Sequence, residues 1–184
     1  MAADLFDPVT LGALEMKNRI VMAPMTRSRA DKNAVPTDVM VDYYRQRAGA
    51  GLIVSEGIAP SADGLGYCRT PGIFNSQQVA AWKRVTDAVH NAGGLIAAQI
   101  MHVGRVASHY NKPASAVTVA PSALQARGEM YTDQAGMQPF DAPQALSLEG
   151  IAQVIDEYKV ATANAFDAGF DAVELHCTSG YLPA

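Results

Sequence analysis

The chain has 184 residues, of which 49% are hydrophobic, so it can bury a core of ordinary domain size without metal ions or disulfides. Acidic residues outnumber basic ones by 18 to 14 and no dense Lys/Arg stripe is present, which argues against a nucleic-acid partner. The two cysteines, Cys68 and Cys177, are too few for a disulfide framework, so we expect one globular domain in a reducing compartment.

The start of the chain, MAADLFDPVTL, lacks a basic segment followed by an apolar stretch, which is the pattern of a secretory signal. No stretch approaches the ~18 consecutive apolar residues that a membrane helix needs. The sequence therefore predicts a soluble, cytoplasmic protein with no membrane segment.

Short apolar runs alternate with helical patterns along the chain. The stretch Val9–Lys17 predicts a small hairpin, and Ile20–Ala23 predicts a strand that is buried on both faces. The further expected elements, in chain order, are a helix over Thr37–Ala48, a strand over Gly51–Glu56, a helix over Ser76–Asn91, a strand over Leu95–Ile100, a helix that Ser147 caps and Gly169 ends, and a strand over Ala172–His176. We expect helix–sheet packing by Tyr43, Tyr44, Trp82 and, on the last helix, Ile151, Val154, Ile155 and Tyr158.

Strand and helix alternate throughout, which is typical of an α/β protein with parallel strands. A doubly wound sheet would carry a glycine-rich turn after its first strand, whereas this position reads PMTRSR and Gly64-Leu65-Gly66 lies in a loop. We therefore favour a TIM-barrel, (β/α)₈, architecture. Because we find only four strands, the chain is expected to supply about the first four βα units, with an N-terminal hairpin.

Polar side chains follow each expected strand at its carboxyl end, where barrels of this type carry their chemistry. These residues are Thr26, Glu56, Gln99, His102, His176, Ser179 and Tyr181. We expect one rim to collect them, and His102 to stabilise a loop rather than line a pocket. Two long segments are expected to roof the pocket, Ile58–Asn75 with Tyr67, and His102–Leu146, which shows no strong periodicity.

A resemblance to a known family rests on five segments in a fixed order: LFDPVTLGALEMKNRIVMAPMTR, LIVSEG, GIFNSQQVAAWKRVTDAVH, AAQIMHVGR and GFDAVELHCTSGYL. Together they resemble the Old Yellow Enzyme family of FMN-dependent ene reductases. The resemblance spans nearly the whole chain and implies an NAD(P)H-dependent FMN oxidoreductase with a (β/α)₈ barrel. Family members continue beyond the segment that matches residues 1–184, and this continuation makes up about half of their chain. Residues 1–184 would therefore form the N-terminal half of such a domain.

The resemblance implies an FMN site at the ends of the first three strands. By position, the flavin would contact Ala23, Pro24, Met25, Thr26, Gly57 and Gln99. Thr26 would lie near the O4 edge of the ring and tune its potential, Gly57 would let the backbone approach the ring, and Gln99 would offer its amide to the pyrimidine edge. NAD(P)H would reduce the flavin first. No metal site is expected, because the histidines show no ligand spacing on a common element.

The same resemblance implies that the substrate is a small activated alkene or a nitro compound. His176 would hydrogen-bond the carbonyl or nitro oxygen, and Tyr181 would protonate the α-carbon after hydride transfer to the β-carbon. Ser179 and Tyr67 would also contact the substrate. Family members usually have Asn or His where this chain has Ser179, so the shorter hydroxyl donor would reach less far.

Half a barrel would lack part of the cofactor site, because the phosphate site of such barrels is frequently built from loops after strands seven and eight. We therefore expect residues 1–184 alone to bind FMN weakly or not at all. The first and fourth strands would be exposed edges, so a complementary C-terminal half or self-association is the expected partner. An alternative function is a noncatalytic fragment that assembles through these edges.

Overall fold

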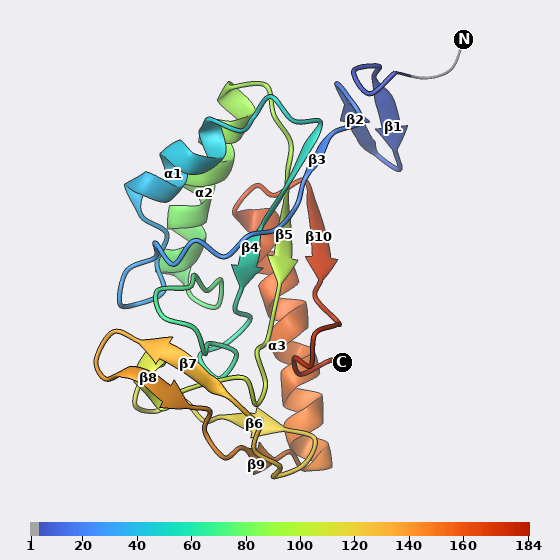
Figure 1. Cartoon of the computed structure of the whole chain (residues 1–184). Helices are drawn as coiled ribbons and strands as arrows, with labels where there is room; N and C mark the ends of the chain where they lie inside the picture. Colours follow the sequence, from blue (N-terminus) through green and yellow to red (C-terminus); the bar gives the residue numbers. More distant parts are fainter. Residues whose placement is uncertain (1–3) are drawn as a thin grey trace.

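The computed structural model describes residues 4–184, and its centre is a four-stranded parallel sheet with three helices packed against one face (Figure 1). The sheet consists of β3 (Val21–Met22), β4 (Leu52–Ile58), β5 (Ile96–Ile100) and β10 (Ala172–Leu175), and the helices are α1 (Asp38–Arg45), α2 (Ser76–Asn91) and α3 (Leu148–Asp167). The other elements are the strands β1 (Val9–Leu11), β2 (Leu14–Met16), β6 (Val119–Ala120), β7 (Glu129–Thr132), β8 (Gly136–Pro139) and β9 (Gln144–Ala145), and a 3₁₀ helix (His109–Asn111).

The strands follow one another across the sheet in reverse chain order, β10-β5-β4-β3, and every neighbouring pair is parallel. An α-helix lies between successive strands of this sheet in the chain. This is the arrangement of four consecutive strands of a (β/α)₈ barrel, which confirms the predicted architecture. β3 and β10 form the two edges of the sheet, as expected for the first and fourth strands.

Alternation along the strands directs side chains into two different clusters. Ile53 and Ile96 join the main core on the helix face. Their neighbours Leu52 and Ala97 pack with Met16 of the β1–β2 hairpin on the other face. Every residue of β4 and β5 is buried, so both faces of these central strands are covered, as their apolar runs predicted.

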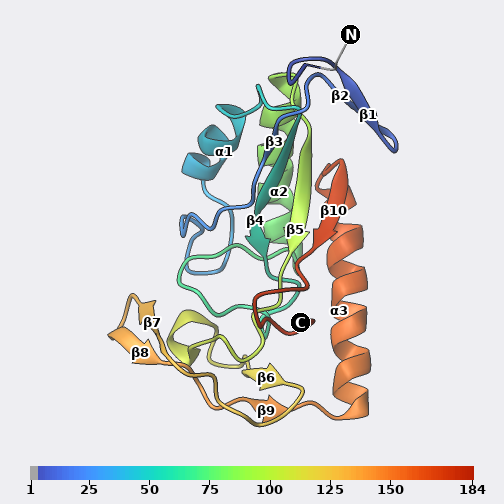
Figure 2. The same ribbon diagram turned by 45° about the vertical axis from the view of Figure 1, so that its right-hand side comes forward.

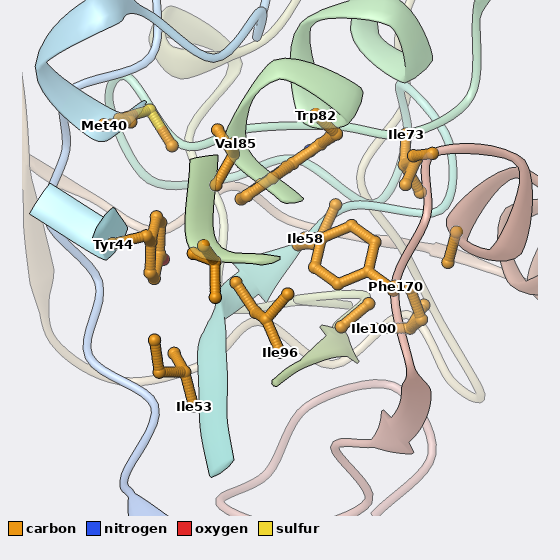
Figure 3. Close-up of a cluster of buried hydrophobic side chains, with 14 of the residues drawn as sticks. Met40, Tyr44, Ile53, Ile58, Ile73, Trp82, Val85, Ile96, Ile100 and Phe170 are labelled. Carbon is orange, nitrogen blue, oxygen red and sulfur yellow. The ribbon is translucent and has the colours of Figure 1, made fainter. Parts of the chain in front are cut away.

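Trp82 of α2 is the largest fully buried side chain and belongs to the main core (Figure 3). Its ring lies 6.0 Å from the ring of Tyr44 and 5.2 Å from that of Phe170. Its Nε1–H donates to the carbonyl oxygen of Gly72 at 3.1 Å, so the indole is buried without an unpaired donor. The predicted packing of Trp82 and Tyr44 is confirmed.

Side-chain caps fix the starts of the two longer helices. Asn75 accepts a hydrogen bond from the N–H of Gln78 at 2.9 Å, and Ser147 accepts one from the N–H of Gly150 at 3.1 Å. Each cap satisfies a backbone donor that has no partner inside its helix. The range predicted for α2 and the capping role predicted for Ser147 are both confirmed.

The predicted inward face of α3 is wrong in its first half. Ile151 and Ile155 are 42% and 51% exposed. α3 packs on the sheet through Ala161 and Ala165 in its C-terminal half, while its N-terminal half extends beyond the ends of the strands (Figure 2). The two isoleucines instead line an apolar groove of about 450 Å³. The apolar stripe is present, but no element within residues 4–184 covers its first half.

The segment His102–Leu146 contains more regular structure than its sequence predicted. β7 and β8 form an antiparallel hairpin, and β6 pairs with β9 in parallel. Lys112 ties this segment to the loop Ile58–Asn75, because its Nζ donates to the carbonyl oxygen of Asp63 at 3.0 Å. Burial lowers the pKa of Lys112 to about 8. Strands of two to four residues are too short to give a periodic signal, which is why the sequence did not reveal them.

Several predicted elements are shorter in the structure. β3 covers two residues, and Pro24 shortly after it has no N–H with which to continue the ladder. The prediction that this strand is buried on both faces is wrong, because β3 is an edge strand and Val21 is 49% exposed. α1 covers Asp38–Arg45, within the longer range that helical spacing predicted. β10 ends at Leu175, so His176 lies just beyond the strand and not within it.

Candidate active site

The carboxyl ends of β4, β5 and β10 lie in register on one side of the sheet, which we call its C-terminal edge to distinguish it from the lateral edges β3 and β10 (Figure 2). His176 directly follows β10, and Thr26 lies beyond the end of β3. Gln99 of β5 lies opposite Gly57 of β4 in the register of the sheet. His176, Thr26 and Gln99 therefore lie at this end of the sheet, as the sequence predicted, whereas the side chain of Glu56 is buried against Tyr44.

An aromatic cluster at this edge consists of His176, Tyr181 and Tyr67. The rings of His176 and Tyr181 are 5.0 Å apart in edge-to-face contact, and those of Tyr181 and Tyr67 are 6.4 Å apart. The two tyrosine hydroxyl oxygens lie 2.9 Å apart, which is a hydrogen bond. The structure thus brings together hydroxyl groups from residues that are 114 positions apart in the chain.

A tight turn after β10 folds Tyr181 back toward His176. Ser179 and Gly180 have φ values of 62° and 77° in this turn, and the N–H of Tyr181 donates to the carbonyl oxygen of Thr178 at 3.3 Å. Ser179 is exposed and makes no hydrogen bond to His176 in the described part of the chain. The structure therefore places Ser179 on the turn, outside the aromatic cluster.

Buried His102 supports the same turn. Its carbonyl oxygen accepts the N–H of Leu182 at 3.0 Å, and its Nδ1 accepts the N–H of Gly104 at 3.1 Å. Burial, together with the charge of Lys112, lowers the pKa of His102 to about 3, so the ring stays neutral and can accept a hydrogen bond. This environment agrees with the expectation that His102 stabilises a loop.

We predict that Gly104→Ala destabilises the protein by about 1 kcal/mol more than Gly12→Ala, because only the first change adds a steric conflict. Both glycines have φ near 60° (59° and 60°), so alanine has the same conformational cost at each position. A Cβ at position 104 would lie 3.0 Å from the backbone nitrogen of Leu182, whereas one at position 12 would meet nothing within 4 Å. Chemical unfolding of both variants measures the difference, and equal losses would contradict the prediction.

The residues Ala23–Thr26, which we call the ledge, lie beside the end of β4. Met25 and Thr26 are exposed, and within residues 4–184 their N–H groups donate to no acceptor. The N–H of the next residue, Arg27, donates to Oε2 of Glu56 at 3.3 Å. The ledge therefore presents free backbone donors and is anchored at its end to β4.

Glu56 is a buried carboxyl group, of which the sequence predicted only that it lies at the end of its strand. Its Oε1 accepts the hydroxyl of Tyr44 at 3.2 Å, and that hydroxyl accepts the N–H of Glu56 at 2.8 Å. Burial raises the pKa of Glu56 to about 7, against the opposing effects of its hydrogen bonds from Arg27 and Tyr44. The anchor of the ledge is therefore a carboxyl group that titrates near neutral pH.

Gly57 and Gln99 have neighbours that were not predicted from the sequence. A Cβ at Gly57 would lie 2.6 Å from Cε and 3.1 Å from Cβ of Met101, so this side chain gives a local reason for glycine. Gln99 is buried, and its Nε2 donates to Oε1 of Glu174 at 2.6 Å. Glu174 and Gln99 pair in register, so alignment of the two parallel strands could have found this contact.

The polar groups of this edge fit the pyrimidine part of a flavin, which presents both donors and acceptors. The free N–H groups of Met25 and Thr26 and the hydroxyl of Thr26 are available donors. Gln99 retains a second amide hydrogen besides the one donated to Glu174. The individual contacts of these residues with FMN remain predictions.

Two further properties concern the described residues as a whole. No group of three His, Cys, Asp or Glu side chains within residues 4–184 could hold a metal ion. No helix in this range has the length and apolar character needed to cross a lipid bilayer.

Comparison with known proteins gives the family. Residues 4–184 match the NADH:flavin oxidoreductase / NADH oxidase family. The chain is 45% identical over 184 residues to chanoclavine-I aldehyde reductase of Penicillium roqueforti, covering 97% of this chain and 47% of that protein. It is 39% identical over 182 residues to a probable flavin mononucleotide-dependent alkene reductase of Leishmania infantum, covering 97% of this chain and 50% of that protein.

The fold agrees with these matches. The structure superimposes on the old yellow enzyme homologue from Zymomonas mobilis with a TM-score of 0.93 at 48% identity, covering 98% of this chain and 50% of that one. The chain thus spans about half the length of the relatives that it matches. The resemblance found in the sequence is confirmed, and the chain belongs to the NADH:flavin oxidoreductase / NADH oxidase family of oxidoreductases.

Proposed function

We propose that the protein is an FMN-dependent oxidoreductase of the ene-reductase type, which reduces an activated C=C bond or a nitro group with NAD(P)H as the reductant. The proposal rests on the contact between His176 and Tyr181, which lie at the same edge of the sheet as the ledge Ala23–Thr26. A hydrogen-bond donor and a proton donor beside a flavin-binding edge are the groups that reduction of a polarised alkene requires. Membership of a flavin oxidoreductase family supports the same conclusion.

His176 is suited to bind and polarise the substrate oxygen. It directly follows β10, and its backbone N–H donates to the carbonyl oxygen of Ile100 at 3.0 Å, which fixes the backbone of this residue against β5. Negative charge develops on the carbonyl or nitro oxygen as hydride adds to the β-carbon. A donor already held in place stabilises this charge without reorganising during the reaction.

Tyr181 is suited to deliver the proton that completes the reduction. Reduced FMN, when bound, supplies the hydride that adds to the β-carbon. The O–H bond of Tyr181 breaks as a C–H bond forms at the α-carbon, and the phenolate regains a proton from solvent. The alkene thereby gains one hydride and one proton and becomes a saturated compound.

The proposed substrate site has an apolar wall. Met101, Val103 and Ala107 form a buried cluster against which the rings of Tyr67 and Tyr181 pack. Such a wall suits a small, uncharged alkene whose only strongly polar group is the activating oxygen. Ser179 lies on the adjacent turn, and its short side chain would contact that oxygen less closely than His176 does.

We also propose that a complementary C-terminal half completes the barrel and the phosphate end of the FMN site. Such barrels frequently build a phosphate site from loops after the seventh and eighth strands of the barrel, and residues 4–184 contain only four barrel strands, β3, β4, β5 and β10. A noncatalytic protein that assembles through the edges of β3 and β10 is the second candidate, because both edges are available for pairing.

An absorbance experiment separates these two functions. The FMN-loaded protein, in its full-length form, is expected to lose its flavin absorbance when NADH or NADPH is added under anaerobic conditions. The absorbance should return when an α,β-unsaturated ketone is added, and the saturated ketone should be the product. A protein whose flavin responds to neither addition would contradict the proposed function and favour noncatalytic assembly.

A further inference from the structure

We propose that Tyr67 is a positioning residue whose hydroxyl holds the hydroxyl of Tyr181 and stabilises the phenolate that proton transfer leaves behind. This inference deepens the proposed function and rests on it. It goes beyond contact between Tyr67 and the substrate, since it assigns the hydroxyl of Tyr67 to another side chain of the protein. The ring of Tyr67 can still form part of the pocket wall.

The geometry favours this role over a direct bond to the substrate. The hydroxyl oxygens of Tyr67 and Tyr181 are 2.9 Å apart, and the rings meet edge to face at 84°. His176 touches the ring of Tyr181 but does not hydrogen-bond its hydroxyl. Within the described range, Tyr67 is the side chain that bonds to the proposed proton donor.

Both tyrosines are held by the same turn of the chain after β5. The carbonyl oxygen of His102 accepts the N–H of Leu182, next to Tyr181, at 3.0 Å. The N–H of Val103 donates to the carbonyl oxygen of Gly64, in the loop that carries Tyr67, at 3.1 Å. Two consecutive residues, His102 and Val103, therefore hydrogen-bond to both loops. These bonds hold the backbones of the two loops, and so the two tyrosines, in place relative to each other.

Further contacts fix the loop around Tyr67. The Nδ2 of Asn111 donates to the carbonyl oxygen of Gly66 at 3.0 Å, and the hydroxyl of Thr70 donates to the carbonyl oxygen of Tyr67 at 3.1 Å. The ring of Tyr67 also packs against Met101 and its buried neighbours. A hydroxyl held in this way loses little freedom when it forms its bond, so it can act as a preorganised donor.

The direction of the bond follows from the protonation of the two groups. Burial, reinforced by the neighbouring hydroxyl of Tyr181, raises the pKa of Tyr67 well above its ordinary range. Tyr67 therefore remains a phenol throughout the reaction. When the O–H bond of Tyr181 breaks and its proton moves to the α-carbon, Tyr67 can donate to the oxygen that has become negative. A hydrogen bond to a charged acceptor is stronger than one between two neutral hydroxyls.

Substitution of Tyr67 with phenylalanine tests the inference, because it removes one oxygen and keeps the ring. In the FMN-loaded, full-length protein, Tyr67→Phe is expected to lower kcat for an α,β-unsaturated ketone by about 3- to 30-fold, as the loss of one such hydrogen bond implies. The KM for the ketone and the rate of flavin reduction by NAD(P)H should not change. Tyr131→Phe is the matched control, since Tyr131 is 54% exposed on β7.

A second readout does not depend on activity. The ¹³Cζ resonance of Tyr181, which senses hydrogen bonding at its oxygen, is expected to move in Tyr67→Phe and to stay in place in Tyr131→Phe. A rise in KM with unchanged kcat would show that Tyr67 binds substrate and would overturn the inference. If the wild type is active but Tyr67→Phe is equally fast and leaves the Tyr181 resonance in place, only this inference is overturned. If the wild type itself cannot reduce the ketone, the proposed function is overturned as well.

Discussion

Replacing Tyr181 with phenylalanine is expected to slow alkene reduction by about 10²- to 10⁴-fold, the usual contribution of general acid–base catalysis. The change removes the proton donor but keeps the ring that packs edge to face on His176 at 5.0 Å. The α-carbon must then take its proton from water that is not held in position. Flavin reduction by NAD(P)H needs no proton from this phenol, so its rate should stay the same.

Stopped-flow measurement of the two half-reactions checks this prediction. Tyr131→Phe removes a hydroxyl from an exposed tyrosine on β7 and serves as the control for both half-reactions. A Tyr181→Phe variant that reoxidises with the ketone at the wild-type rate would mean that another group supplies the proton. Equal slowing of both half-reactions would instead indicate damage to the flavin site.

The central strands were predicted well because a strand that is covered on both faces can be recognised from its own residues. β4 and β5 are covered on both faces, so they appear as nearly continuous apolar runs between turn residues. The stripe through Ile151 and Ile155 was just as clear, yet it failed, since periodicity shows that a face is apolar but not which element covers it. The short strands β6 to β9 gave no signal at all.

The candidate site was predictable as a rim, but its contacts were not. Parallel strands place His176, Gln99 and Thr26 at one edge, and this follows from the order of elements alone. The bond between Tyr67 and Tyr181 depends on how two loops return over that edge. Loop conformation is set by tertiary hydrogen bonds such as that from Leu182 to His102, which no sequence pattern encodes.

Glu56 is expected to make the stability of the protein depend on pH between about 4.5 and 7. Burial raises the pKa of this carboxyl from 4.5 to about 7, so the folded state binds the proton more tightly than the unfolded state. Below pH 4.5 both states are protonated and the full stability is present. As the pH rises toward 7 the unfolded state loses its proton first, and the free energy of unfolding falls by about 3 kcal/mol in total, or about 1.4 kcal/mol per pH unit.

Glu56→Gln removes the titrating group and keeps a side chain of the same shape, so its free energy of unfolding should lack this fall. The difference between wild type and variant, measured by chemical unfolding from pH 4.5 to 8, isolates Glu56 from all other groups. Glu129→Gln, at an exposed position of β7, is the control for the loss of one carboxylate charge. Parallel curves for wild type and Glu56→Gln would show that burial does not raise the pKa. A fall confined to the wild type would show that this buried carboxyl, which anchors the ledge at Arg27, destabilises the fold as it ionises.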